Sequence, residues 1–156
     1  MKPFLKRLLI GGLAIGAGAF LVMQLVPYGR DHSNPPVVSE PTWDSPQTRD
    51  LAERACFDCH SNETVWPWYS NVAPISWLVQ HDVEEGREKL NFSTWAQGGG
   101  EEADEMTEVI AEGEMPMPIF LLTHAEARLT AAEKQALMNG LQTMRGGSGS
   151  FEGNDD

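Results

Sequence analysis

The chain of 156 residues has few of the groups on which metal sites and enzymes usually depend. It contains only two cysteines, Cys56 and Cys59, so a structural zinc site would lack the second ligand pair that it usually needs. A disulfide between them would close a very short loop and stabilise the fold little. No strand pattern surrounds them, as a thioredoxin-like pair would require. There is also no internal repeat and no constellation typical of acid–base catalysis. These absences favour one small all-helical domain.

Basic residues are scarce after the first 30 positions. Those 30 positions contain no acidic residue and four basic ones: Lys2, Lys6, Arg7 and Arg30. The remainder has 7 basic and 23 acidic residues, a net charge of −16. Such a surface repels nucleic acid, which we exclude as a partner. It suits a partner protein with a basic docking patch, although acidity that serves solubility alone fits equally well.

The N-terminal segment has the features of a membrane anchor. Three basic residues precede an apolar run, Leu8–Pro27, which is interrupted only by Gln24 and is long enough to cross a bilayer as a helix. The charge bias predicts a cytoplasmic N-terminus. A signal peptide cleaved near residues 17–19 is the alternative, but the apolar run continues past that point, which favours an uncleaved anchor. A G-x-x-x-G pattern at residues 12–16 predicts weak anchor-mediated dimerisation.

The composition divides the chain into four parts. We expect a membrane anchor or signal peptide at 1–29 and an extended, proline-rich spacer at 30–45. A helical domain at 46–145 and a disordered tail at 146–156 follow.

Periodicity and capping residues predict four helices in the domain, at about 46–60, 75–90, 101–112 and 130–144. Ser45-Pro46 starts the first, Gly113 stops the third and Thr130–Glu133 is a capping box for the fourth. Gly98–Gly100 is expected to be a flexible break. Residues 61–74 contain two prolines and three large aromatic side chains, so we expect an irregular segment whose rings cover the edge of a cofactor.

The sequence Cys56-Phe57-Asp58-Cys59-His60 is the attachment signature of a c-type haem, C-x-x-C-H. Two cysteines three positions apart lie on one face of a helical turn, where both sulfurs can form thioethers to the vinyl groups of one haem. His60 then becomes the proximal iron ligand. Its Nδ1–H needs a backbone carbonyl acceptor, for which we expect Pro67 or Pro74.

The ligand on the opposite side of the iron is predicted from the segment Glu114–Pro118. Prolines hold Met115 on a stiff, irregular backbone, which suits a thioether ligand, and thioether raises the potential of the couple. Met115 is therefore the favoured sixth ligand. Met117, His81, His124 and an open iron site are the alternatives.

Several motifs occur in the order found in one family: residues 56–64, 66–70, 72–77, 86–93 and 113–116. Over residues 34–145 the chain resembles the bacterial haem-binding domain family. The resemblance implies an exported, mostly helical c-type domain with a single haem, often behind an N-terminal membrane segment. It implies Cys56 and Cys59 as thioether attachments, His60 as axial ligand and Met115 as the second one. The extra Met117 departs from the family pattern.

These observations favour a membrane-tethered electron carrier, not an enzyme, that holds one covalently bound haem c in the periplasm at the bacterial inner membrane. Its partner would be a redox protein. A haem-based sensor or ligand-binding module with a displaceable sixth ligand is the alternative. A peroxidase-like enzyme is a third hypothesis, against which the lack of a distal His–Arg pair argues.

Overall fold

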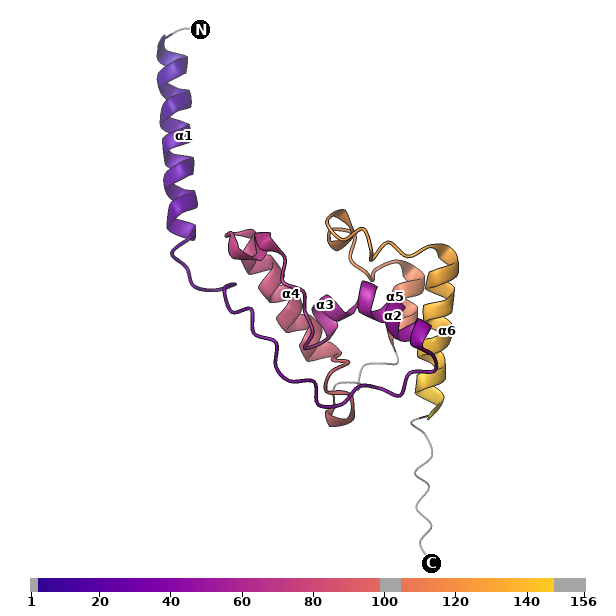
Figure 1. Cartoon of the computed structure of the whole chain (residues 1–156). Coiled ribbons are helices and arrows are strands. Elements are labelled where there is room, and N and C mark those ends of the chain that lie inside the picture. Colours follow the sequence, from indigo (N-terminus) through magenta and orange to yellow (C-terminus); the bar gives the residue numbers. More distant parts are fainter. Residues whose placement is uncertain (1–2, 99–104, 148–156) are drawn as a thin grey trace, which may run out of the picture. The chain divides into compact units, whose positions relative to one another are not determined.

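The computed structural model describes residues 3–98 and 105–147, and its regular elements are helices (Figure 1). Six α-helices follow one another along the chain: α1 (Pro3–Met23), α2 (Pro46–Ala55), α3 (Phe57–His60), α4 (Ile75–Lys89), α5 (Met106–Glu112) and α6 (Ala131–Gly147). No strand occurs in the described residues, where Ser39 and Thr94 form one isolated bridge. The prediction of an all-α fold with one apolar N-terminal helix is confirmed.

The chain forms two compact units. The first consists of residues 1–33 and 66–82, and the second of residues 34–65 and 83–156. Helix α1 belongs to the first unit; its 21 residues include none that is buried and no acidic residue, and its mean hydropathy reaches 1.7 over an 18-residue window. Its length and composition suffice to cross a membrane.

The second unit has a hydrophobic core in which α2 and α5 both pack against α6. Apolar residues at helical spacing supply it, such as Met106 with Ile110 in α5 and Leu137 with Leu141 in α6. The core cluster consists of Leu51, Ala52, Ala55, Phe57, Leu90, Phe92, Met106, Ile110, Leu129, Leu137 and Leu141. Burying each of the leucine side chains contributes roughly 1.5–3 kcal/mol. The helix before the C-x-x-C-H signature and Phe57 inside the signature are therefore attached to this core.

The prediction of one helix from residue 46 to His60 is wrong at one position. Ser45 is the N-cap, since its side chain accepts a hydrogen bond from Thr48 N–H, but the helix stops at Ala55. Cys56 leaves helical geometry with φ −129° and ψ −35°, and α3 follows. The interruption comes where the buried Phe57 ring enters the core cluster, a packing demand that helical periodicity alone does not reveal.

The other helix boundaries follow the sequence more closely. Helix α4 ends one residue before the predicted Leu90, and Gly113 stops α5 in the left-handed conformation with φ 79°. Helix α6 continues three residues beyond residue 144. Residues 61–74 contain only the short 3-10 helix η1 (Trp68–Asn71). Three predictions fall wholly or largely outside the described residues. The glycine break and the acidic start of the third helix fall on residues 99–104, and the tail falls on residues 148–156.

The predicted spacer is extended, and its residues from Asn34 onward are hydrogen-bonded within the second unit. The N–H groups of Val38 and Ser39 donate to the Ser93 carbonyl at 2.9 and 3.0 Å, and Trp95 N–H donates to the Ser39 carbonyl at 3.0 Å. Asn34 Nδ2 donates to the Thr64 carbonyl at 2.9 Å. Residues 34–39 therefore contribute to the packing of the second unit. The domain boundary at 45/46 itself stays a prediction.

The predicted capping box at the start of α6 is confirmed. Glu133 Oε2 accepts hydrogen bonds from Thr130 N–H at 2.7 Å and from Thr130 Oγ1 at 2.8 Å, while Glu133 N–H donates to Thr130 Oγ1. Arg54 Nη1 of α2 lies 2.9 Å from Glu133 Oε1. The hydrogen bond from Thr130 N–H, followed by that from Arg54, lowers the pKa of Glu133 to about 2.

The capping box predicts an acid-sensitive contribution to stability. A carboxyl group whose pKa is lowered on folding stabilises the fold above its unfolded pKa of about 4.3, and this contribution disappears as the pH falls toward 2. Glu133→Gln should therefore lower the urea midpoint at pH 6, and the difference from wild type should shrink between pH 4.5 and pH 2. Glu112→Gln, which removes an exposed charge at the end of α5, should show no such trend. A difference that is equal at pH 6 and pH 2 would contradict the assignment.

Candidate haem site

The C-x-x-C-H signature forms a single turn between α2 and the end of α3. The Cys56 carbonyl accepts hydrogen bonds from Cys59 N–H at 3.2 Å and from His60 N–H at 2.9 Å. Both cysteines are free thiols on half-buried residues. Burial, with a smaller effect from Cys59, raises the pKa of the Cys56 thiol to about 12. The thiol is therefore protonated at neutral pH.

The imidazole of His60 is oriented by the C-terminal end of α4. Its Nδ1 lies 2.9 Å from the Gly86 carbonyl oxygen and 3.2 Å from that of Leu90. Because a carbonyl can only accept, the proton is on Nδ1 and Nε2 is left unprotonated. Burial lowers the pKa of His60, an effect that the two carbonyls oppose, so the ring is neutral at neutral pH. A neutral imidazole with a bare Nε2 is the form that binds iron.

The prediction that the carbonyl of Pro67 or Pro74 accepts this proton is wrong. The Pro67 carbonyl accepts from the N–H and hydroxyl groups of Ser70, and the Pro74 carbonyl accepts from the N–H groups of Trp77 and Leu78. The Leu90 carbonyl instead lies just beyond the last residue of α4, where the helix leaves carbonyls without an internal partner. Pairing it with His60 satisfies both groups.

Gly86 lets the backbone of α4 approach the C-x-x-C-H turn closely. A Cβ atom at this position would lie 2.6 Å from the Cys59 carbonyl oxygen and 3.1 Å from the Cys59 Cβ. Any side chain would therefore push α4 away from the turn. Because Gly86 has no side chain, its carbonyl oxygen can come within hydrogen-bonding distance of His60 Nδ1.

A buried polar network continues from His60 along the chain. Phe92 N–H donates to the His60 carbonyl at 2.8 Å. Asn62 N–H donates to Ser93 Oγ at 2.9 Å, and Asn91 Nδ2 donates to Asn62 Oδ1 at 3.0 Å. Ser93 is completely buried, and Asn62 and Asn91 are at most 7% exposed. These amides and hydroxyls satisfy one another, so the segment after His60 is fixed against the segment after α4.

Arg87 holds the backbone on the other side of the same turn. Its Nε donates to the Ser61 carbonyl at 2.8 Å, and its Nη2 donates to Thr64 Oγ1 at 3.0 Å and Asn34 Oδ1 at 2.9 Å. No role for Gly86, Arg87, Asn62 or Asn91 was predicted from the sequence. All four lie in two of the motifs that carry the family resemblance, residues 56–64 and 86–93, and this was the available signal.

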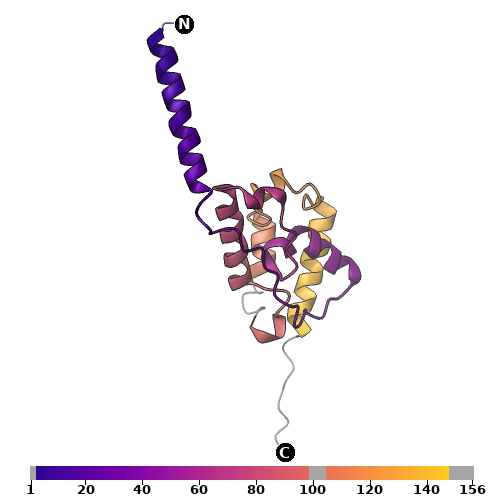
Figure 2. The ribbon, with the colours of Figure 1, turned by 60° about the vertical axis from the view of Figure 1, so that its left-hand side comes forward.

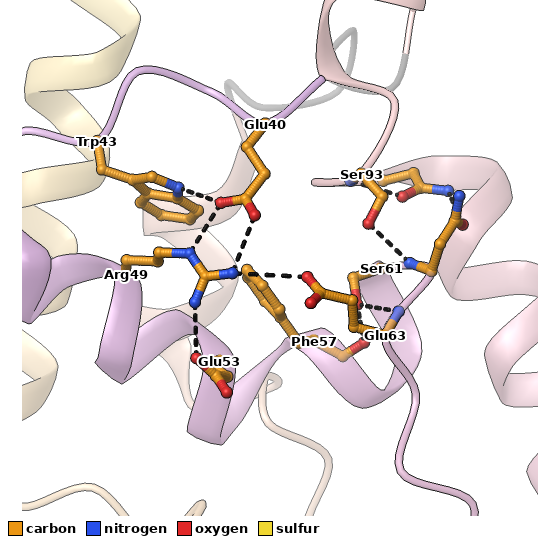
Figure 3. Close-up of polar contacts among 10 residues, drawn as sticks. Glu40, Trp43, Arg49, Glu53, Phe57, Ser61, Glu63 and Ser93 are labelled. Carbon is orange, nitrogen blue, oxygen red and sulfur yellow. Dashed lines mark hydrogen bonds and ion pairs between the residues drawn. The ribbon is translucent and has the colours of Figure 1, made fainter. Parts of the chain in front are cut away.

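An ionic cluster centred on Arg49 lies beside the turn, on the side of α2 (Figure 3). Arg49 forms two hydrogen bonds of 2.9 Å to Glu40 and one of 2.7 Å to Glu53, and its guanidinium group lies 5.2 Å from the centre of the Phe57 ring. Glu63 is 3.5 Å from the same guanidinium. The hydrogen bond from Arg49 lowers the pKa of Glu40. This cluster joins the extended segment to both sides of the C-x-x-C-H turn.

The sequence model of the haem-binding domain family matches residues 18–143 of this chain. The chain belongs to the haem-binding domain family. No curated protein and no solved structure gives a match. The family match supports haem binding and a binding module in place of a defined enzyme family.

The residues present fit a haem. The His60 ring offers an unprotonated nitrogen to iron, and the adjacent thiols are not engaged in a disulfide. In residues 3–98 and 105–147, no group of three or more His, Cys, Asp or Glu side chains is placed to hold a metal ion. His60 and the two cysteines are the candidate residues for holding a haem in this domain.

The four candidates for the opposite ligand lie in different surroundings. Met115 and Met117 are half-buried in the segment after α5, and Met115 N–H donates to the Val109 carbonyl at 3.1 Å. His81 is exposed on α4. The half-buried ring of His124 stacks on Phe120 with 3.8 Å between centroids.

The close approach at Gly86 predicts a specific loss in Gly86→Ala. Alanine normally stabilises a helix relative to glycine, but here the added methyl group overlaps Cys59, so we expect a loss of about 1–3 kcal/mol in unfolding free energy and a lower haem yield. Urea denaturation of the full chain and quantification of bound haem test this. Glu88→Ala, at an exposed position of the same helix, should stay within about 0.5 kcal/mol of wild type. A Gly86→Ala protein as stable as wild type would contradict the tight packing.

Proposed function

We propose that the chain binds one haem c covalently, through thioether bonds from Cys56 and Cys59, and acts as a membrane-tethered electron-transfer protein. The observation that carries this proposal is the His60 ring, whose Nδ1–H is held by the carbonyls of Gly86 and Leu90 so that Nε2 is free for iron. Bound haem supplies the one-electron couple of its iron. The protein residues attach the group, orient its proximal ligand and limit access to the metal.

Covalent attachment also fits the electrostatics of the cysteines. The raised pKa of the Cys56 thiol shows that a thiolate is costly in this place. A thioether sulfur carries no charge and avoids that cost. The same turn, in which the N–H groups of Cys59 and His60 both donate to the Cys56 carbonyl, brings His60 directly beside the two cysteines.

Met115 is the proposed sixth ligand. The N–H groups of Glu114 and Met115 both donate to the Val109 carbonyl, at 2.9 and 3.1 Å, so the backbone of Met115 is held against the end of α5. A fixed backbone lowers the entropic cost of presenting a thioether to iron. Met117 follows two positions later, where its carbonyl accepts from Leu121 N–H at 3.2 Å.

The two histidine alternatives are less suited. In His124, Nδ1 lies 3.0 Å from the Phe120 carbonyl oxygen, and Nε2 lies 3.9 Å from Asp58 Oδ2, so both ring nitrogens face protein oxygens. His81 lies five positions before Gly86 on α4, which places it roughly 140° around the helix from the surface that contacts Cys59. These contacts support a His/Met pair over a bis-histidine site.

The proposed location is the periplasmic side of the bacterial inner membrane, with α1 as an uncleaved anchor and the N-terminus in the cytoplasm. The basic residues before the apolar segment and the strongly acidic remainder of the chain support this orientation and a redox partner with a basic docking patch. The exposed charges would steer such a partner without requiring high affinity.

Covalent attachment predicts that each cysteine contributes to haem retention. In a host with the haem-attachment machinery, Cys56→Ala and Cys59→Ala should each lower the yield of covalent haem, and the double variant should lose it entirely under acid–acetone extraction. Mass spectrometry should show wild type heavier than the polypeptide by one haem. Wild-type protein of unmodified mass, colourless after extraction, would end the c-type assignment.

The ligand assignment predicts that Met115→Ala keeps its covalent haem but changes the ferric and ferrous optical spectra and lowers the midpoint potential, because a soft thioether stabilises the reduced iron. Met117→Ala is the matched control and should resemble wild type. The reverse pattern would identify Met117 as the ligand. Rapid and complete binding of carbon monoxide to the reduced wild-type protein would show an accessible iron and contradict a role in electron transfer alone.

A further inference from the structure

Residues 66–80 contain no Asp, Glu, Lys or Arg, in a chain with a net charge of −12. Three of their apolar side chains are exposed: Trp68 at 80%, Ile75 at 48% and Leu78 at 45%. That the aromatic rings of this segment cover a cofactor stays a prediction. Trp68 is among the most exposed large hydrophobic side chains in the described residues. An uncharged segment with several exposed apolar groups is typical of a surface that contacts a partner or a membrane.

Gln24 connects this segment to the end of α1, within the first unit. Its Nε2 donates to the Ala73 carbonyl at 2.9 Å, and Ala73 N–H donates to its Oε1 at 3.0 Å. The side-chain amide thus satisfies both backbone groups of one residue. Gln24 is the one polar residue in the apolar run, and this pair of hydrogen bonds explains its presence.

Further contacts join the residues after α1 to the same segment. Gly29 has φ 80°, and a Cβ atom there would lie 2.5 Å from the Ser76 carbonyl oxygen. The ring of His32 stacks on that of Trp66 with 4.6 Å between centroids, and its Nε2 lies 3.1 Å from the Ser70 carbonyl oxygen. Figure 2 shows the start of α4 beside the C-terminal end of α1.

The length of α1 sets the depth of this connection. Its 21 residues span about 31 Å at 1.5 Å per residue, close to the thickness of the hydrocarbon core. Gln24 follows the last residue of α1 and lies three positions before the end of the apolar run at Pro27, so it falls near the outer boundary of the hydrocarbon, and so does Ala73, to which it is hydrogen-bonded. Tryptophan and tyrosine are enriched at that depth. A charged side chain that lies on the hydrocarbon side of the headgroups costs free energy. Arg30, whose guanidinium donates to the Gln24 carbonyl, is placed to meet headgroup phosphates.

We propose that residues 66–78 form a membrane-interface element in which Trp68, Ile75 and Leu78 enter the lipid headgroup region and Gln24 is the positioning residue. This inference rests on the proposed membrane span of α1. The element attaches the exported part of the chain to the bilayer at a second place besides the helix itself.

Site-specific photo-crosslinking in isolated membranes tests the proposal with the full-length protein carrying its haem. Replacement of Trp68 by p-benzoylphenylalanine should give phospholipid adducts on irradiation, detected by mass spectrometry. Replacement of His81, which is exposed on α4 six positions after Ile75 in the same unit, is the matched control and should give at least about threefold less adduct. Replacement of Phe20 in α1 reports whether the helix is in the membrane.

In the Gln24→Leu background, the adduct at position 68 should fall at least about threefold, because both hydrogen bonds to Ala73 are lost while α1 becomes more apolar. The adduct at position 20 should be unchanged. Lipid adducts at position 20 with none at position 68, or adducts at 68 to a protein in place of lipid, would overturn the interface element alone. No lipid adduct at position 20 would overturn the membrane anchor and the interface element with it.

Discussion

The hydrogen bond from His60 Nδ1 to the end of α4 is the interaction on which the proposed site depends. It fixes the tautomer and the direction of a ring that belongs to a four-residue helix, an element too short to be stable by itself. The ring can be held only because Gly86 allows the two backbones to approach, and because Leu90 has a carbonyl that the helix leaves unpaired. Removal of any of these conditions would weaken the orientation of the ring.

Buried polar side chains, which are uncommon in protein interiors, make the surroundings of this interaction rigid. The residues that surround the turn are mainly small polar side chains, such as Ser61, Asn62 and Ser93, which are almost completely buried. Hydrophobic packing is non-directional, whereas paired amides and hydroxyls fix one register between two segments. The hydrophobic core of α2, α5 and α6 supplies the stability of the second unit, and the polar network supplies the position of the histidine.

The sequence predicted the helical class, the haem signature, the caps at Ser45 and Thr130 and the stop at Gly113, because each of these depends on neighbouring residues. It did not predict the interruption at Cys56 or the acceptors of the His60 proton. Both depend on contacts between segments about 30 positions apart, which no local pattern encodes. The iron-ligand assignments, that of His60 included, stay predictions.

The support of His60 has a consequence for the acidity that the domain can tolerate. The groups that contact the His60 ring and the segment after it are carbonyls, amides, hydroxyls and the guanidinium of Arg87, which keep one protonation state over a wide range of pH, whereas the carboxylates of the Arg49 cluster titrate. Contacts of this kind would keep the direction of the His60 ring constant while surface carboxylates gain and lose their protons.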